Sequence, residues 1–113
     1  MEANLLNNLF ERFESIVKTV DGIECWSARG LYPLLGYTQW RGFEDAVNRA
    51  KESCKQATGS IEDHFADVRK KVELGSGATR EIDDILLTRY ACYLVAQNGD
   101  PRKQEVAFAQ TYL

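Results

Sequence analysis

Hydrophobic residues recur every three or four positions through the first twenty residues, which is the spacing of one face of an α-helix. Polar residues such as Asn7, Glu11 and Lys18 take the opposite positions, and Asp21-Gly22 then supplies turn chemistry. The pattern predicts an amphipathic helix over residues 3–20. Its hydrophobic face consists of Leu6, Leu9, Phe10, Phe13, Ile16, Val17 and Val20.

The next forty residues predict a short strand followed by two helices. Residues 23–26 are expected to form the strand, and Ser27 is a favourable N-cap for a helix over 28–35. Gly36 stands where a helix end favours positive φ, and Thr38 is expected to cap a second helix over 39–57. Two helices joined by a short glycine turn have the length pattern of a helix-turn-helix motif.

In the second half of the chain, residues 68–74 alternate between two sides, which predicts a strand with one solvated face. One side carries Val68, Lys70, Val72 and Leu74, and the other carries Arg69, Lys71 and Glu73. The glycine-rich segment 75–78 is the expected hairpin loop, and 79–87 is the expected returning strand. Thr88 is placed to cap a helix over 89–98, and Asp100-Pro101 to begin a last helix that runs to Leu113. The predicted fold class is α+β, with several helices packed around a small antiparallel hairpin sheet in one domain over residues 1–113.

Composition restricts the class of protein. The chain of 113 residues is 44% hydrophobic and 27% charged, which is typical of a globular domain. No apolar run reaches the length of a membrane span, and Met1-Glu2-Ala3-Asn4 does not begin a signal peptide, so a cytoplasmic location is expected. The three cysteines are odd in number and irregularly spaced, which favours reduced, buried thiols over disulfides or zinc ligands.

Catalytic and cofactor chemistry finds little support in the residues. His64 is the one histidine, and no sequence context marks a cysteine or serine as its nucleophile. Asp83 and Asp84 could hold a metal, but adjacent residues of a strand point to opposite faces. The glycines at 75–78 lie between two strands and lack a nucleotide-binding pattern. We therefore expect no enzyme activity, no cofactor and no metal.

Cations are concentrated locally although the net charge is −3. Arg69, Lys71 and Arg80 are expected to lie on one exposed face of the two-stranded ribbon, and β-ribbons enter DNA grooves. Arg41 lies near the start of the second helix of the helix-turn-helix-like pair, and Arg49 lies on its exposed face. These five residues are the predicted nucleic-acid contacts. A solvated strand face and ordinary helix packing are the alternatives.

Several short segments, in this order, resemble the N-terminal domain of the DNA-damage-inducible protein D family. The front half is also similar, more loosely, to the Bro-type N-terminal domains of phage antirepressors. The segments that carry the resemblance are Trp26-Ser27-Ala28-Arg29, Leu34-Leu35-Gly36-Tyr37, Trp40-Arg41, Phe43-Glu44, Asp63-His64-Phe65, Asp67-Val68, Gly75-Ser76-Gly77-Ala78, Thr88-Arg89-Tyr90-Ala91-Cys92-Tyr93-Leu94, Gln97-Asn98-Gly99-Asp100-Pro101 and Gln110-Thr111-Tyr112.

The resemblance implies a bacterial or prophage protein tied to the SOS response. Its expected partners are single- or double-stranded DNA, or a recombinase filament or repressor on DNA. The family supplies no catalytic residues. Its members continue past the last of these segments, so the chain is expected to be the front piece of a longer architecture, and Leu113 replaces an expected aromatic. A protein-interaction or dimerisation module without DNA contact remains the alternative, and the acidic net charge favours it.

Overall fold

The computed structural model describes residues 3–113, with side chains described from Asn7 onward. The predicted place of Leu6 on the hydrophobic face therefore lies outside the described side chains. The described residues form five helices and four strands: α1 (Ala3–Ser15), β1 (Lys18–Val20), β2 (Ile23–Ser27), α2 (Ala28–Leu34), α3 (Trp40–Thr58), β3 (Phe65–Glu73), β4 (Thr79–Thr88), α4 (Arg89–Gln97) and α5 (Gln104–Tyr112).

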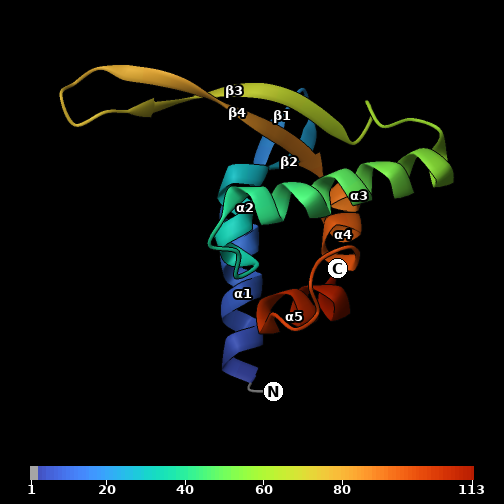
Figure 1. The fold of residues 1–113 in the computed structure, drawn as a ribbon. Helices are drawn as coiled ribbons and strands as arrows, with labels where there is room; N and C mark the ends of the chain where they lie inside the picture. The colour runs from blue at the N-terminus through green and yellow to red at the C-terminus, as the bar shows by residue number, and fades with distance from the viewer. Residues whose placement is uncertain (1–2) are drawn as a thin grey trace.

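The strands form one antiparallel sheet in the order β1-β2-β4-β3, which confirms the α+β class. In Figure 1 the sheet crosses the top of the molecule, and the helices lie below it. Strands β3 and β4 run past the helices on one side as a long two-stranded ribbon, which we call the arm. The arm is the most prominent projection from the domain.

The core centres on Trp26, which is completely buried. Its ring stacks on Phe13 of α1 with centroids 4.5 Å apart, and its Nε1 donates to the Phe13 carbonyl at 2.8 Å. Phe43 and Val47 of α3 and Leu87 of β4 are also fully buried. Burial of each such side chain contributes on the order of 1.5–3 kcal/mol, so this cluster fixes the helices against the sheet.

The first predicted helix ends earlier than expected. Residues 18–20 form strand β1, with Val20 opposite Ile23. Asp21 and Gly22 between them have φ of 53° and 80°, the combination that a type I′ hairpin turn requires. The Asp-Gly pair is therefore a hairpin turn between two strands, and its prediction as a helix stop was wrong.

Two further helix starts differ from the sequence prediction. Helix α3 has Gln39 as its N-cap with no side-chain cap bond, so Thr38 does not cap it. Helix α5 begins at Gln104 rather than at Pro101. The Asp100 carboxylate accepts from the backbone N of Arg102 at 3.0 Å and pairs with the Arg102 side chain, which closes a local turn ahead of the helix.

The predicted caps at Ser27 and Thr88 and the predicted positive φ at Gly36 are confirmed. The Ser27 side chain accepts from the Gly30 backbone, and the Thr88 side chain accepts from the Ala91 backbone. Gly36 has φ of 79°, and Gly59 ends α3 with φ of 76°. No helix in the described range 3–113 is long and apolar enough to cross a membrane.

Candidate nucleic-acid interface

The register of the arm decides which of its side chains share a face, because directly opposed residues of an antiparallel pair point the same way. Arg69 lies opposite Asp83, and Lys71 lies opposite Glu81. Lys70 lies opposite Ile82, and Val72 lies opposite Arg80. The arm therefore has two different faces. We call Arg69, Lys71, Glu73, Glu81 and Asp83 the mixed face, and Lys70, Val72, Arg80 and Ile82 the cationic face.

The mixed face neutralises its own cations. The Arg69 Nε lies 3.3 Å from the Asp83 carboxylate, and both side chains are well exposed. Glu81 lies across the ribbon from Lys71, and Glu73 follows on the same face. An exposed pair of this kind stabilises the fold by at most about 1 kcal/mol, but it cancels the local positive potential.

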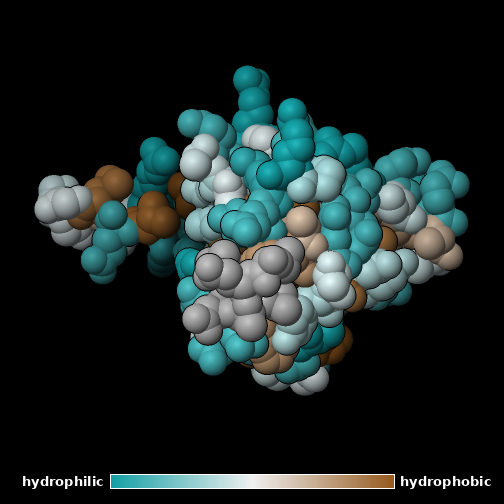
Figure 2. Space-filling view, turned by 90° about the horizontal axis from the view of Figure 1, so that it is seen from below, coloured by the Kyte–Doolittle hydropathy of each residue, from teal (hydrophilic) through white to brown (hydrophobic). Residues whose placement is uncertain are grey.

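The cationic face has a different composition. Its two cations each lie opposite an aliphatic residue, and Val72 and Ile82 are half-buried. Leu74 next to the loop is 43% exposed. Figure 2 shows hydrophobic residues among hydrophilic ones on the projecting arm. A face that combines two cations with aliphatic side chains can contact both a phosphate and an apolar group.

The prediction that Arg69, Lys71 and Arg80 share one face is wrong, because Arg80 belongs to the opposite face. The predicted loop over 75–78 implies that Arg80 lies opposite Glu73. Instead the Leu74 N donates to the Ala78 carbonyl at 2.7 Å, so the loop is one residue shorter. A shift of one residue moves a side chain to the other face. The same shift places Arg80 on the same face as Lys70, and the sequence reasoning missed this grouping.

Asp84 fixes the base of the arm to α2. Asp84 is 3% exposed, and its carboxylate accepts from the Ser27 Oγ at 2.5 Å, from the Arg29 N at 2.9 Å and from the Ile85 N at 2.8 Å. A carboxylate at the first turn of a helix is also favoured by the helix dipole. Arg29 adds a second link, since its Nε donates to the Asp83 carbonyl at 2.9 Å and its guanidinium lies 3.8 Å from the Trp40 ring centroid.

The two adjacent aspartates therefore have separate roles. Asp84 is buried with three donors, whereas the Asp83 side chain is exposed and pairs with Arg69. Within residues 3–113 no group of three or more His, Cys, Asp or Glu side chains is placed to hold a metal ion. The arrangement of Asp84 is that of a structural anchor.

The two predicted arginines of α3 differ in their surroundings. Arg41 is exposed in the first turn of the helix. The Arg49 Nη2 donates to the Asn98 carbonyl at 2.6 Å, at the C-cap of α4. A cation there is attracted by the negative end of the helix dipole, so Arg49 has a structural role.

The surface between α3 and the arm is not a cationic path. A groove of about 360 Å³ lies there, and its charged lining consists of four carboxylates and two cations: Glu44, Asp67, Asp83, Asp84, Lys51 and Arg69. Lys51 and Asp67 approach each other to 4.0 Å across it. The structure therefore does not join Arg41 to the arm through a continuous positive surface.

The remaining reactive groups have structural surroundings. All three cysteines are free and buried. Burial raises the pKa of the Cys92 thiol far above its ordinary value of 9.0, so the thiol stays protonated and is a poor nucleophile. The His64 Nδ1 lies 2.7 Å from the Thr88 Oγ1, the same hydroxyl that caps α4.

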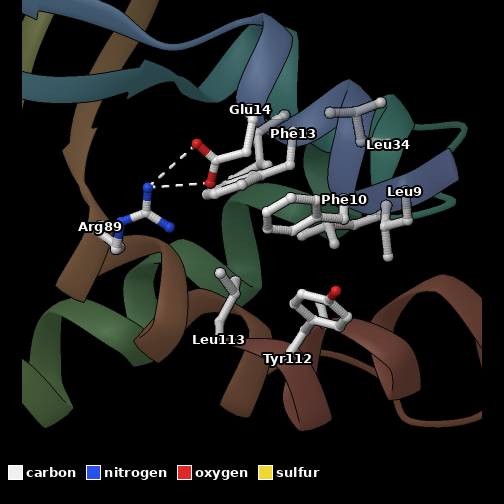
Figure 3. Close-up of a pocket in the computed structure, with 11 residues that line it drawn as sticks. Leu9, Phe10, Phe13, Glu14, Leu34, Arg89, Tyr112 and Leu113 are labelled. Atoms are coloured by element: carbon white, nitrogen blue, oxygen red, sulfur yellow. Dashed lines mark hydrogen bonds and ion pairs between the residues drawn. The ribbon is translucent and has the colours of Figure 1, made fainter. Parts of the chain in front are cut away.

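An apolar cavity of about 140 Å³ lies between α1, α2 and the end of α5. Figure 3 shows Phe10, Phe13 and Leu34 facing Tyr112 and Leu113 across it. At the edge of the cavity the Arg89 guanidinium lies 3.0 Å from the Glu14 carboxylate, so the charges of these two side chains compensate each other. Sequence reasoning missed this cavity because residues from opposite ends of the chain form it.

Known proteins resemble the chain over most of its length. The sequence profile described as the BRO family, N-terminal domain, matches residues 15–113. The DNA damage-inducible protein D of Escherichia coli (strain K12) is 47% identical over 108 residues. That match covers 95% of this chain but 39% of the relative, so the chain spans less than half of the relative's length. No solved structure matches the chain.

Proposed function

The chain belongs to the BRO family, whose N-terminal domain it matches over residues 15–113, and we propose that it is a cytoplasmic, non-enzymatic module that binds DNA or a protein assembled on DNA. The proposal places it in the damage response or in antirepressor-type control, where a recombinase filament or a repressor is the candidate partner. The name of its relative, a DNA damage-inducible protein, supports this context.

The observation that carries the proposal is the cationic face of the arm. Lys70 and Arg80 lie on a ribbon that projects from the domain, and the cationic face carries no acid among its four residues. A two-stranded ribbon fits the major groove of duplex DNA. Cations on such a ribbon contact phosphates, and aliphatic residues between them contact the thymine methyl group.

Of the five predicted contacts, Arg80 is therefore proposed as the main DNA contact. Lys70, which was not among the five, is proposed as a second main contact. Arg41 is proposed as an auxiliary phosphate contact because it is exposed at the start of α3. Arg49, Arg69 and Lys71 are proposed to contribute only to the long-range potential. Arg49 and Arg69 already have partners within the fold, and Lys71 lies opposite Glu81.

The test is fluorescence anisotropy of labelled single- and double-stranded oligonucleotides at low salt. We expect Arg80→Glu and Lys70→Glu each to weaken binding by about tenfold, because a reversed charge removes about 1.4 kcal/mol or more of phosphate attraction. The matched control is Arg69→Glu, which reverses a charge on the other face of the same arm and should weaken binding less than threefold. Equal losses for Arg69→Glu and Arg80→Glu would contradict the assignment of the face.

The second candidate function is protein interaction without DNA contact. The net charge of −3 and the carboxylates of the mixed face favour it. If the folded wild-type domain binds neither oligonucleotide, direct DNA contact is wrong and this second function stands. A partner on DNA, or a second copy of the chain, would then be identified by sedimentation with and without a recombinase filament.

A further inference from the structure

Strand β3 forms one edge of the sheet. It is nine residues long and pairs with β4 alone among the described strands. The opposite edge strand, β1, has three residues. A long edge strand presents backbone donors and acceptors that another extended segment can use.

The register shows which backbone groups of β3 are free for that use. At one end of the strand the Thr88 N donates to the His64 carbonyl at 3.1 Å, and at the other the Leu74 N donates to the Ala78 carbonyl. His64 and Leu74, the residues on the β3 side of these two bonds, have even numbers. Along an antiparallel strand the backbone N–H and C=O groups of successive residues point alternately toward and away from the paired strand. The odd-numbered residues Asp67, Arg69, Lys71 and Glu73 therefore direct their N–H and C=O groups outward.

We infer that this edge binds an extended segment of another protein, which adds to the sheet as a fifth strand beside β3. Arg69, Lys70 and Lys71 give the middle of the edge three consecutive cations, and Asp67 and Glu73 give its two ends a negative charge. Like charges placed opposite each other between paired strands are destabilising. The complementary segment therefore has carboxylates at its centre and cations at its ends.

The same charges decide against a second copy of the chain as the occupant. Two β3 strands paired at their centres bring the three cations of each copy together. Consecutive cations on an edge strand are a known protection against such self-pairing. The half-buried Val68 and Val72 lie on the side of β3 that bears Lys70, so the added strand needs aliphatic residues on that side.

This edge shares Lys70 with the proposed DNA contact, but the two can be separated because they depend on different groups. Strand addition uses the outward backbone groups of odd-numbered residues in β3, whereas the cationic face uses the side chains of Lys70 and Arg80. Strand addition can hold when DNA binding fails, and the reverse is also true. Arg80 lies on β4, away from the edge, and so separates the two activities.

The probe is a synthetic peptide with the palindromic sequence lysine-valine-glutamate-valine-glutamate-valine-lysine, which matches the edge in either strand direction. Its control exchanges every lysine and glutamate. We expect the first peptide to bind the domain at least tenfold more tightly than its control. On binding, the backbone amides of Arg69 and Lys71 should become protected from hydrogen exchange, because they gain acceptors.

The variant Lys71→Pro removes one outward donor and leaves the β3–β4 ladder intact, since proline is tolerated on the outer side of an edge strand. Its matched control, Lys71→Ala, removes the same charge and keeps the donor. We expect Lys71→Pro to bind the peptide at least tenfold more weakly than Lys71→Ala, and Arg80→Glu to leave peptide binding within threefold of the wild type.

Three results would overturn the inference. The first is a peptide that shows no preference over its charge-exchanged control. The second is binding without protection of the Arg69 and Lys71 amides in the wild-type domain, which needs no variant. The third is protection of those amides by duplex DNA in place of the peptide, which would assign the edge to nucleic acid.

Discussion

The Ser27 hydroxyl donates a hydrogen bond to the Asp84 carboxylate, across 57 residues of chain. Ser27 is the N-cap of α2, and Asp84 lies in β4 where the arm leaves the body of the domain. The same carboxylate accepts from the Arg29 N. One buried side chain therefore satisfies the start of a helix and sets the direction of the arm.

We predict that Asp84→Ala lowers the free energy of unfolding by about 2–4 kcal/mol, because it leaves the buried Ser27 hydroxyl and the Arg29 N without their acceptor. The matched control is Asp83→Ala, whose exposed carboxylate makes only a surface ion pair, and its effect should stay below about 1 kcal/mol. Urea denaturation followed by tryptophan fluorescence measures both. Equal effects for the two variants would show that Asp84 is not an anchor.

Gly36 combines a left-handed backbone with a close neighbour. Its φ is 79°, and an added Cβ would lie 2.8 Å from the Glu105 Oε1. We expect Gly36→Ala to destabilise the domain by about 1–2 kcal/mol, mainly from backbone strain, because the exposed Glu105 carboxylate ends a flexible side chain and can move aside. Gly59→Ala is the control, because φ there is 76° with no atom within 4 Å of the added Cβ.

Strain alone should lower the stability of Gly59→Ala by about 1–2 kcal/mol. The difference between the two variants in thermal or urea unfolding therefore measures the contact with Glu105. A clearly larger loss for Gly36→Ala than for Gly59→Ala would contradict this, and would show that Glu105 is held too firmly to move away from the α2–α3 turn.

Cys92 gives a pH dependence with a definite sign. Burial raises the pKa of its thiol above the ordinary value of 9.0, so above pH 9 the unfolded chain releases a proton that the folded chain retains. Its contribution to stability is thus fully present below pH 9 and is lost as the pH rises. We expect Cys92→Ala to lose stability less steeply than the wild type above pH 9, by up to about 1.4 kcal/mol per pH unit.

Urea unfolding of both proteins between pH 8 and 10.5 measures that difference in slope. The variant also loses buried volume, which lowers its stability by a constant amount at every pH and does not affect the slope. Parallel curves for the two proteins would contradict the prediction. In the native domain below pH 9, a disulfide reagent should label Cys92 only after unfolding.

DNA binding should weaken with salt in proportion to the phosphates that the protein contacts. On duplex DNA each contact contributes about 0.9 to the slope of log affinity against log salt, and on single strands about 0.7. Replacing both Lys70 and Arg80 by alanine should therefore reduce the duplex slope by about 1.8. Anisotropy titrations at several salt concentrations measure it, and an unchanged slope would show that neither side chain contacts a phosphate.

Local chemistry made much of the fold predictable. The caps at Ser27 and Thr88 and the glycine at position 36 each act through neighbours in the chain, and all three are confirmed. The buried residues of α3, which include Phe43 and Val47, recur every three or four positions, and this spacing is typical of one face of a helix. At Asp21-Gly22 the same type of reasoning failed, because a helix stop and a hairpin turn use the same residues.

The arrangement of the candidate interface depends on information that the pattern does not contain. Which face Arg80 occupies is decided by one residue of loop length, through the bond between Leu74 and Ala78. From the sequence Asp84 was considered only as a metal ligand, and its partner Ser27 is distant in sequence. Pairings between residues far apart in the chain must be known before such side chains can be assigned a role.

The register of the arm also governs how its length can change among related sequences. Toward its loop the ribbon leaves the helical body (Figure 1), so residues can be added or removed near the loop without disturbing the core. Two residues gained in each strand keep every distal side chain on its present side, whereas one residue gained in each strand exchanges the sides. We therefore expect the arms of related sequences to differ in length by multiples of four residues. A grafted arm with one extra residue in each strand should present its acidic side chains where the parent presents its cations.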